Sequence, residues 1–221
     1  MAALRAPRDG RWPRWPRSSV TEPFFVDARS QPLFPLKTVL FPGGQLSLRI
    51  FEARYLDLVR ECGRSGQTFG ICLIIEGEEA GPPALPATVG CEARIADFST
   101  TPDGLLQLSV QGERRFQVTA TRARDNGLVV ADVSWFDTPL PEAIRPEHEL
   151  LSLLLRRIVE RAGPPFDQFD KARLNDAEWV SWRLAEWLPL SLPQRQTLLV
   201  ESDPQARLQR LVELIPEYQS C

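Results

Sequence analysis

Glu52 and Arg54 stand out first, because an acid and a base lie two positions apart inside an otherwise apolar run. A carboxylate that exchanges a proton beside a cation is one arrangement used in general acid–base catalysis. Catalysis would also need a nucleophile or a second base, and the neighbouring sequence offers neither. Glu52 is expected in the first turn of a helix, where the helix dipole favours a carboxylate. We therefore interpret the two residues as a structural ion pair, with Asp57 or a backbone carbonyl as alternative partners of Arg54.

The other reactive residues form no catalytic or metal-binding motif. The run from Gly63 to Gly66 has neither the spacing nor the lysine of a phosphate-binding loop. Only Lys37 and Lys171 could activate a serine, and neither lies in a suitable context. The single histidine, His148, is expected in solvent rather than at a catalytic centre. The cysteines include no Cys-x-x-Cys pair and are Cys62, Cys72, Cys91 and Cys221. We predict no catalytic residue, no metal and no cofactor, and we expect three of the cysteines to be reduced core residues of a cytoplasmic protein.

Aromatic residues are better candidates for a functional role, as contacts in a binding surface. Trp179, Trp182 and Trp187 have two interpretations, a helical core or an exposed anchor for an apolar peptide, and we favour the core. Trp135 and Phe136 are adjacent on a strand, so their side chains point to opposite faces and one of them is expected at the surface or at a domain junction. The predicted partner-binding surface consists of Arg49, Phe98, Trp135 and Phe136.

The run from Leu33 to Tyr55 must organise these residues. Its prolines, at positions 35 and 42, are expected to interrupt strand pairing, and the Pro-Gly-Gly run at 42–44 forces a turn. Alternating apolar residues from Leu46 to Ile50 predict a half-buried strand. Apolar residues then recur at helical spacing from Phe51 to Cys62, with Gly63 as the expected end of the helix.

This run resembles the opening signature of the Lon N-terminal domain, the substrate-binding domain of ATP-dependent protease La. The matching residues are Phe34, Pro35, Leu36, Phe41, Pro42, Gly43, Phe51, Glu52, Arg54 and Tyr55. Further matches follow in the family's order, at Phe69-Gly70, Val89 to Ile95, Asp103-Gly104, Gly112 to Phe116 and Asp176 to Ile215. Ala53 stands where many members carry proline. Since the chain lacks the ATPase and serine–lysine motifs of a whole Lon protease, the resemblance implies a stand-alone recognition domain that is not an enzyme.

The rest of the chain divides into a strand-rich half and a helical half. Short alternating segments predict strands up to Trp135, with a hairpin at Asn126-Gly127 and a bulge or bend at Gly112. Capping pairs are expected at Asn175 with Glu178, Ser191 with Gln194, and Ser202 with Gln205. We predict an α+β fold. Residues 1–29 form a flexible tail, residues 30–137 a mostly antiparallel, PUA-like β pseudobarrel with one inserted helix, and residues 138–221 a C-terminal helical bundle.

Composition and charge limit the partners. The net charge of −3 and a pI near 5.4 argue against a general nucleic-acid binder. A local basic stripe remains open, formed by Arg114, Arg115, Arg122 and Arg124. No segment is long and apolar enough for a membrane helix. The tail is interpreted as disordered or, alternatively, as an anchor for an anionic partner.

Three functions follow from these features. The first is a binding module for unfolded or degradation-tagged polypeptides, acting as an adaptor or holdase in the cytoplasm of a bacterium, with an ATP-dependent protease as a candidate partner and weak homodimerisation left open. The second is nucleic-acid recognition by a PUA-like barrel. The third is an enzyme of unknown type, for which the sequence offers no convergent polar set. We favour the first, which the resemblance implies.

Overall fold

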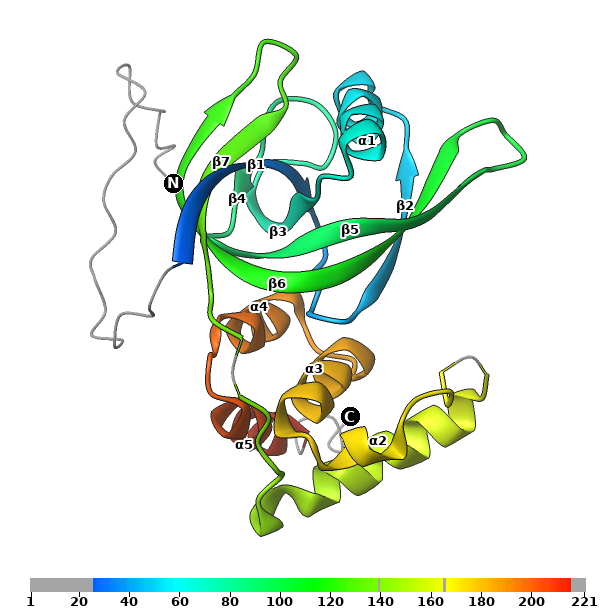
Figure 1. Cartoon of the computed structure of the whole chain (residues 1–221), viewed down its shortest axis with the longest axis vertical. Coiled ribbons are helices and arrows are strands. Elements are labelled where there is room, and N and C mark those ends of the chain that lie inside the picture. The colour runs from blue at the N-terminus through cyan, green and yellow to red at the C-terminus, as the bar shows by residue number, and fades with distance from the viewer. Residues whose placement is uncertain (1–25, 139, 165, 216–221) are drawn as a thin grey trace, which may run out of the picture.

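The computed structural model describes residues 26–138, 140–164 and 166–215 (Figure 1). Within these residues, seven strands precede four α-helices, and one further helix is inserted between the second and third strands. A tail was predicted over residues 1–29, and residues 1–25 of it lie outside the described residues. Strand β1 already begins at Val26, which is inside the segment that was expected to be tail.

The strands form a mostly antiparallel sheet, as predicted. They are β1 (Val26–Leu36), β2 (Gln45–Ile50), β3 (Phe69–Glu76), β4 (Leu85–Pro86), β5 (Val89–Thr100), β6 (Leu106–Ala123) and β7 (Val129–Trp135). The order along the sheet is β1-β7-β6-β5-β3-β4, with β2 paired to β6. Because β1 also pairs in parallel with β3, the pairing returns to the first strand and the sheet closes on itself.

The turn after β1 is fixed to the middle of β6. The Gly43 N–H donates to the Gly112 carbonyl and the Gly112 N–H donates to the Gly44 carbonyl, each at 2.8 Å. The register of β5 against β6 shifts beside Gly112, which confirms the expected irregularity there. The expected interruption at Pro35 is wrong, since Pro35 lies within β1 opposite Cys72 of β3. A proline lacks only the N–H, and its carbonyl can still join a ladder.

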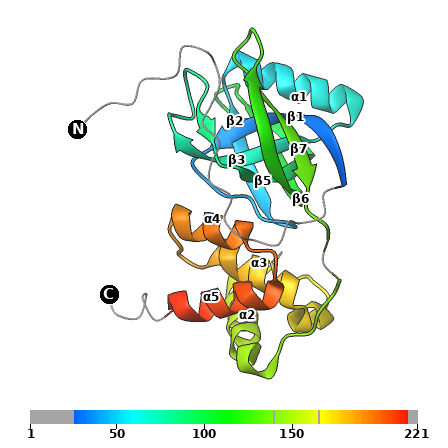
Figure 2. The ribbon, with the colours of Figure 1, turned by 90° about the vertical axis from the view of Figure 1, so that its left-hand side faces the viewer.

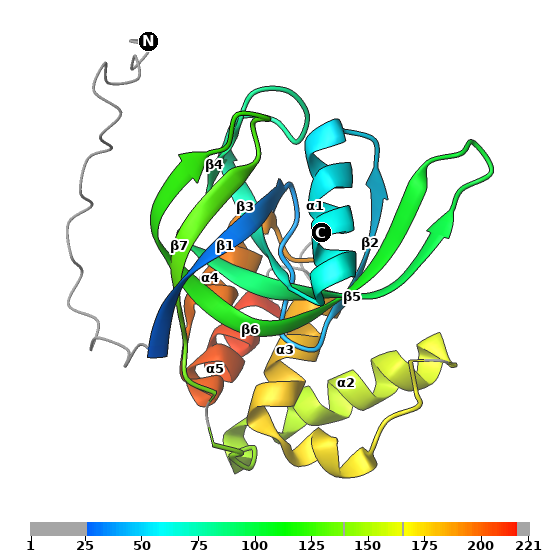
Figure 3. The ribbon, with the colours of Figure 1, turned by 45° about the horizontal axis from the view of Figure 1, so that its top comes forward.

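Helix α1 (Ala53–Ser65) lies across one side of the sheet (Figure 3). The prediction that it begins at Phe51 and ends before Gly63 is wrong at both ends. Glu52 is extended and occupies the N-cap position without a side-chain capping hydrogen bond, so it lies before the first turn in which it was expected. The Phe51 side chain is 61% exposed instead of buried on the helix face. Gly63 continues the helix, whereas Gly66 adopts the left-handed conformation with φ 69° and donates its N–H to the Cys62 carbonyl. A left-handed glycine is a common helix stop.

The second half of the chain is helical. It contains the short 3₁₀ turns η1 (Pro146–His148) and η2 (Lys171–Asn175) and the helices α2 (Glu149–Ala162), α3 (Ala177–Trp187), α4 (Leu192–Val200) and α5 (Pro204–Leu214). The predicted capping box of Ser191 and Gln194 is confirmed. The other two caps lie one residue later than predicted, at Asp176 and Asp203. In each case the carboxylate accepts from backbone N–H groups of the first turn, a role for which neighbouring Asn and Ser residues also compete.

The helices α2 to α5 lie together on one side of the sheet (Figure 2). Trp182 is buried in their shared core, and Trp179 and Trp187 are partly buried against it, which confirms a core role for Trp182. The prediction that His148 is solvated is wrong. Its ring is buried, with Nδ1 3.1 Å from Gln205 Oε1 and Nε2 3.3 Å from Gln209 Oε1.

One buried arginine joins the sheet to the helices, and a second one packs among the helices. Arg115 of β6 donates to the carbonyls of Leu199 and Glu201 at the end of α4, at 2.8 and 3.0 Å. Arg207 of α5 lies 3.4 Å above the centre of the Trp182 ring. Burial lowers the pKa of Arg115 to about 10 and that of Arg207 to about 9. The cations are stabilised by helix-end carbonyls and aromatic faces, so the two halves have a defined relative position.

Candidate functional site

The four residues of the predicted contact surface do not lie together. Arg49 and Phe98 are exposed on the outer part of the sheet, and Phe98 is 71% exposed. Trp135 is only 6% exposed, so its predicted surface role is wrong. It packs with Phe116 in the interior of the closed sheet, in a core cluster that also contains Leu33 of β1 and Cys72 of β3. Phe136 is half-buried at the junction, where the Arg115 guanidinium lies 4.5 Å from its ring centre.

The outer part of the sheet has an apolar face and a polar face. We call it the arm, which consists of β2 and residues 94–111 of β5 and β6. The β5–β6 end of the arm projects beyond the rest of the sheet (Figure 3). Leu48, Leu108 and Phe98 lie abreast on its three strands. Their side chains share one face, because side chains at directly paired positions point the same way. Arg49 is one residue further along β2 and therefore points to the opposite face.

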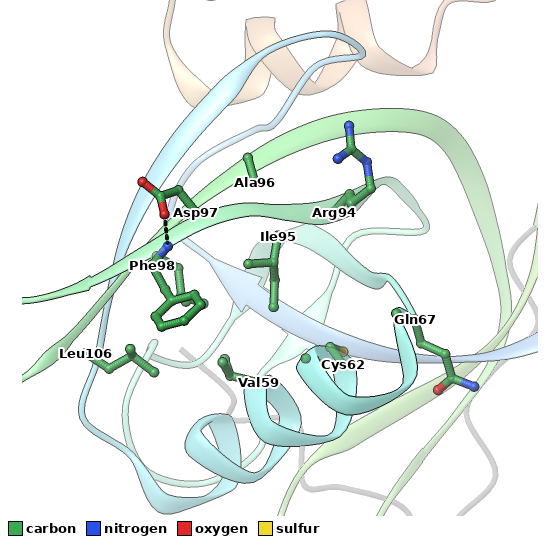
Figure 4. Close-up of a pocket in the computed structure, with 12 residues that line it drawn as sticks. Val59, Cys62, Gln67, Arg94, Ile95, Ala96, Asp97, Phe98 and Leu106 are labelled. Carbon is green, nitrogen blue, oxygen red and sulfur yellow. Dashed lines mark hydrogen bonds between the residues drawn. The ribbon is translucent and has the colours of Figure 1, made fainter.

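A bulge in β5 turns Phe98 toward the apolar face. The pairing of β5 with β6 shifts between Ile95, which lies opposite Val110, and Asp97, which lies opposite Ser109. In a regular strand Ile95 and Phe98 would point to opposite faces. The extra residue of the bulge places both on the same face. Figure 4 shows the two side chains pointing toward α1 while Asp97 points away.

An open groove of about 640 Å³ lies between this apolar face and helix α1 (Figure 4). Val59 and Cys62 line it from α1, and Ile95, Phe98 and Leu106 line it from the arm. Gly63 and Gly66 line it without side chains, and a Cβ added at either position would meet nothing within 4 Å. Pockets of this size commonly hold a ligand by apolar contact.

The groove holds no reactive group in a reactive state. Burial raises the pKa of the Cys62 thiol to about 11, so the thiol is protonated and a poor nucleophile near neutral pH. Arg94 at the rim forms an ion pair with Glu113. The Asp97 carboxylate accepts the backbone N–H of Phe98 at 2.8 Å. Among the residues that line the groove, the arrangement is suited to binding rather than catalysis.

Glu52 and Arg54 form the structural ion pair that was expected. Arg54 Nη2 lies 2.9 Å from Glu52 Oε2, and the guanidinium lies 4.8 Å from the Tyr55 ring centre. Arg54 also donates to the Gly127 carbonyl at 3.3 Å, so the pair ties α1 to the β6–β7 hairpin. The side chain is buried, and the contacts are those of a structural cation.

Sequence reasoning found one residue of the groove, Phe98, and missed the others. The alternation of Leu106, Leu108 and Val110 indicated an apolar strand face. No local signal indicated that α1 leaves part of this face open, because that depends on the end of the helix at Gly66 and on the bulge in β5. Among the described residues, no group of three or more His, Cys, Asp or Glu could hold a metal ion.

A family model for the ATP-dependent protease La (LON) substrate-binding domain matches residues 30–217. The chain belongs to this family. Among curated proteins, Lon protease of Cytophaga hutchinsonii is 25% identical over 196 residues, which cover 83% of this chain and 24% of that protein. Lon protease 2 of Myxococcus xanthus is 24% identical over 192 residues, covering 83% and 23%. This Lon-family chain thus spans about a quarter of the length of these relatives.

Solved structures agree with the family assignment. A Lon N-terminal domain protein from Xanthomonas campestris is 48% identical with a TM-score of 0.72, and the match covers 84% of this chain and 98% of that chain. The N-terminal domain of a Mycobacterium avium complex Lon protease gives a TM-score of 0.63 at 20% identity, covering 84% and 97%, and supports the fold alone. In the described part of the Lon-family chain, no helix is long and apolar enough to span a membrane.

Proposed function

We propose that this chain is a non-catalytic polypeptide-binding module and that the groove between α1 and the arm is its binding site. The observation that carries the proposal is the exposure of Phe98 at an open apolar groove in a member of a substrate-binding family. Exposed apolar surface of this kind is costly to a folded chain unless a partner covers it. The partners that fit are apolar segments of unfolded or degradation-tagged polypeptides, since folded proteins keep such segments inside.

Within this proposal the chain works as an adaptor or a holdase. The matched Lon proteases are about four times as long, so the ATPase and peptidase steps would belong to a separate ATP-dependent protease that receives the client. The buried, unpaired thiols of Cys62, Cys72 and Cys91 fit a reducing compartment such as the cytoplasm. In this proposal the closed sheet is a PUA-like pseudobarrel over residues 30–137, and the helices form a bundle over residues 138–221.

The nucleic-acid alternative is not favoured, because the basic stripe on which it depended is neutralised. Arg115 is buried at the junction. Arg114 pairs with Glu92 at 3.2 Å, Arg122 with Asp132 at 2.8 Å, and Arg124 with Glu61 at 2.9 Å. With one arginine buried and three beside carboxylates, the stripe has little net positive charge to attract phosphates.

A weak homodimer is part of the proposal, through helix α2. Leu150 and Leu153 are exposed on this helix, with Glu149 before them and Arg157 after them. In an antiparallel pair of α2 helices, each Glu149 would meet an Arg157 of the second copy across the two leucines. Sedimentation velocity is the test, and a Leu153→Glu variant that self-associates as strongly as the parent protein would exclude this contact.

The groove is tested by filling it. The protein is titrated into a fluorescently labelled, chemically unfolded polypeptide, and anisotropy is recorded at low and high salt. Gly63→Leu is expected to weaken binding about tenfold, because Gly63 lines the groove, a Cβ there meets nothing within 4 Å, and a larger side chain would take up space in the groove. Gly63→Ala is the matched control and is expected to bind within about twofold of the parent. Because the contact is apolar, affinity is expected to survive high salt. Equal affinities for the parent and Gly63→Leu would refute the groove as the site.

A further inference from the structure

The groove lies where the pairing of β5 stops on one side. Strand β3 pairs with β5 at three positions only, and the last of them joins Phe69 to Ala93. Before Phe69 the chain turns away into α1, and Gly66 and Gln67 line the end of the groove. From residue 94 to residue 100, β5 pairs with β6 on one side, and among the described residues no strand pairs with its other side.

We propose that the groove binds its client as an added β-strand, antiparallel to β5 along residues 94–100 and in line with β3. This inference rests on the proposed function and adds the mode of recognition. Seven residues of extended chain span about 23 Å. Alternate side chains of the added strand would enter the groove beside Ile95 and Phe98, and its backbone would pair with the free edge of β5. The client is thus an extended segment with apolar residues at every second position.

One backbone donor of β5, the Phe98 N–H, is bonded to a side chain and not to another strand. The N–H of Phe98 donates to the carboxylate of its own neighbour, Asp97, at 2.8 Å. Both residues are exposed. The Asp97 carboxylate thus occupies a backbone donor that a carbonyl of an added strand could accept from instead. An acidic residue and a bulge are two means by which folded proteins protect a free edge against unselective pairing. Asp97 therefore protects the free edge of β5, and a bound strand would displace its carboxylate from the Phe98 N–H.

Backbone methylation of the client tests the pairing. The probe is a labelled peptide of alternating leucine or valine and threonine with a lysine at each end. In an antiparallel pair, every second N–H of the added strand points toward its neighbour. Methylating one alternate set of amide nitrogens is expected to weaken binding at least tenfold, whereas methylating the other set is not. If the parent peptide binds and the two methylated sets behave alike, the strand-addition mode is wrong and the proposed function stands. If neither the parent peptide nor an unfolded polypeptide binds, the proposed function itself fails.

A pair of substitutions at Asp97 tests the same inference from the protein side. Asp97→Ala frees the Phe98 N–H and is expected to strengthen peptide binding about three- to tenfold, the equivalent of one hydrogen bond. Asp97→Asn removes the charge but keeps an acceptor oxygen, and it is expected to bind close to the parent affinity. An equal increase in peptide affinity in the two variants would assign the effect to the charge of Asp97 and would contradict its proposed protection of the Phe98 N–H.

Discussion

Gly112 is the position at which a single methyl group is expected to do most damage to the sheet. A Cβ at Gly112 would lie 2.2 Å from the Phe41 carbonyl oxygen, against an ordinary contact distance of 3.4 Å or more. The neighbour is the backbone of Phe41, directly before the turn at 42–44, and it cannot rotate away as a side chain could. Both hydrogen bonds of Gly112 to this turn, each 2.8 Å long, are formed at the same point. Gly112→Ala must therefore separate the turn from β6.

The cost has two parts. Overpacking of a close contact typically lowers the free energy of unfolding by ~1–3 kcal/mol. Loss of two backbone hydrogen bonds adds ~1 kcal/mol each. The expected loss is therefore ~3–5 kcal/mol, which is a large share of the ~5–15 kcal/mol that stabilises a typical folded chain.

The assay is urea unfolding followed by tryptophan fluorescence, with Gly63→Ala as the matched control. Gly63 lies in helix α1 and a Cβ there meets nothing within 4 Å, so alanine is expected to stabilise by ~0.5–1 kcal/mol. Both variants reduce the entropy of the unfolded chain in the same way, so their difference isolates the contact at Gly112. A loss below ~1 kcal/mol for Gly112→Ala would refute the reasoning.

The arginine junction, the buried thiols and the capping box of α4 each have a measurable consequence. Arg207→Ala is expected to lower the free energy of unfolding by ~3 kcal/mol, because it leaves a cavity beside the Trp182 ring. Arg207→Met is expected to lower it by less than half as much, because methionine keeps the volume and removes a buried cation. Equal losses for the two variants in urea unfolding would contradict this. Burial raises the pKa of Cys62 to about 11 and also raises the pKa of Cys72 and Cys91. In a Cys221→Ser variant, no thiol is therefore expected to react quickly with a disulfide reagent at pH 8 until the protein is unfolded. Fast labelling of the folded variant would contradict this. Ser191→Ala is expected to cost ~1 kcal/mol in thermal unfolding through loss of the cap, and a change below the error of the measurement would show that Pro at the first helical turn suffices.

Local signals in the sequence were sufficient to predict helices, strands and caps, but not to predict which side chains are exposed. The alternation from Leu46 to Ile50 predicted a strand, and Ser191 with Gln194 predicted a cap, because each depends on neighbours a few residues away. The burial of His148 depends on two glutamines more than fifty residues later in the chain. The burial of Trp135 depends on side chains from distant strands, such as Leu33 of β1 and Cys72 of β3, that share its core cluster. No local pattern contains that information.

The candidate site shows the same division. Phe98 was predicted to lie at the surface of the barrel or at its junction, and its side chain is exposed. Its orientation toward α1 depends on a bulge at one residue, which the sequence Ile95 to Phe98 does not mark with glycine or proline. Trp135 was included because it and Phe136 point to opposite faces of a strand, but that alternation does not say which of the two is buried, and an aromatic residue in a sheet is as readily a core residue as a contact.

The measurement that tests the central claim most directly compares two exposed phenylalanines. Phe98 lines the groove, whereas Phe51 is comparably exposed and lies outside the residues that line it. In anisotropy titrations with the labelled unfolded polypeptide, Phe98→Ala is expected to raise the Kd about tenfold, the equivalent of losing part of a buried aromatic contact. Phe51→Ala is expected to leave the Kd within about twofold of the parent value. Equal effects of the two substitutions, or a larger effect at Phe51, would contradict the assignment of the groove as the binding site.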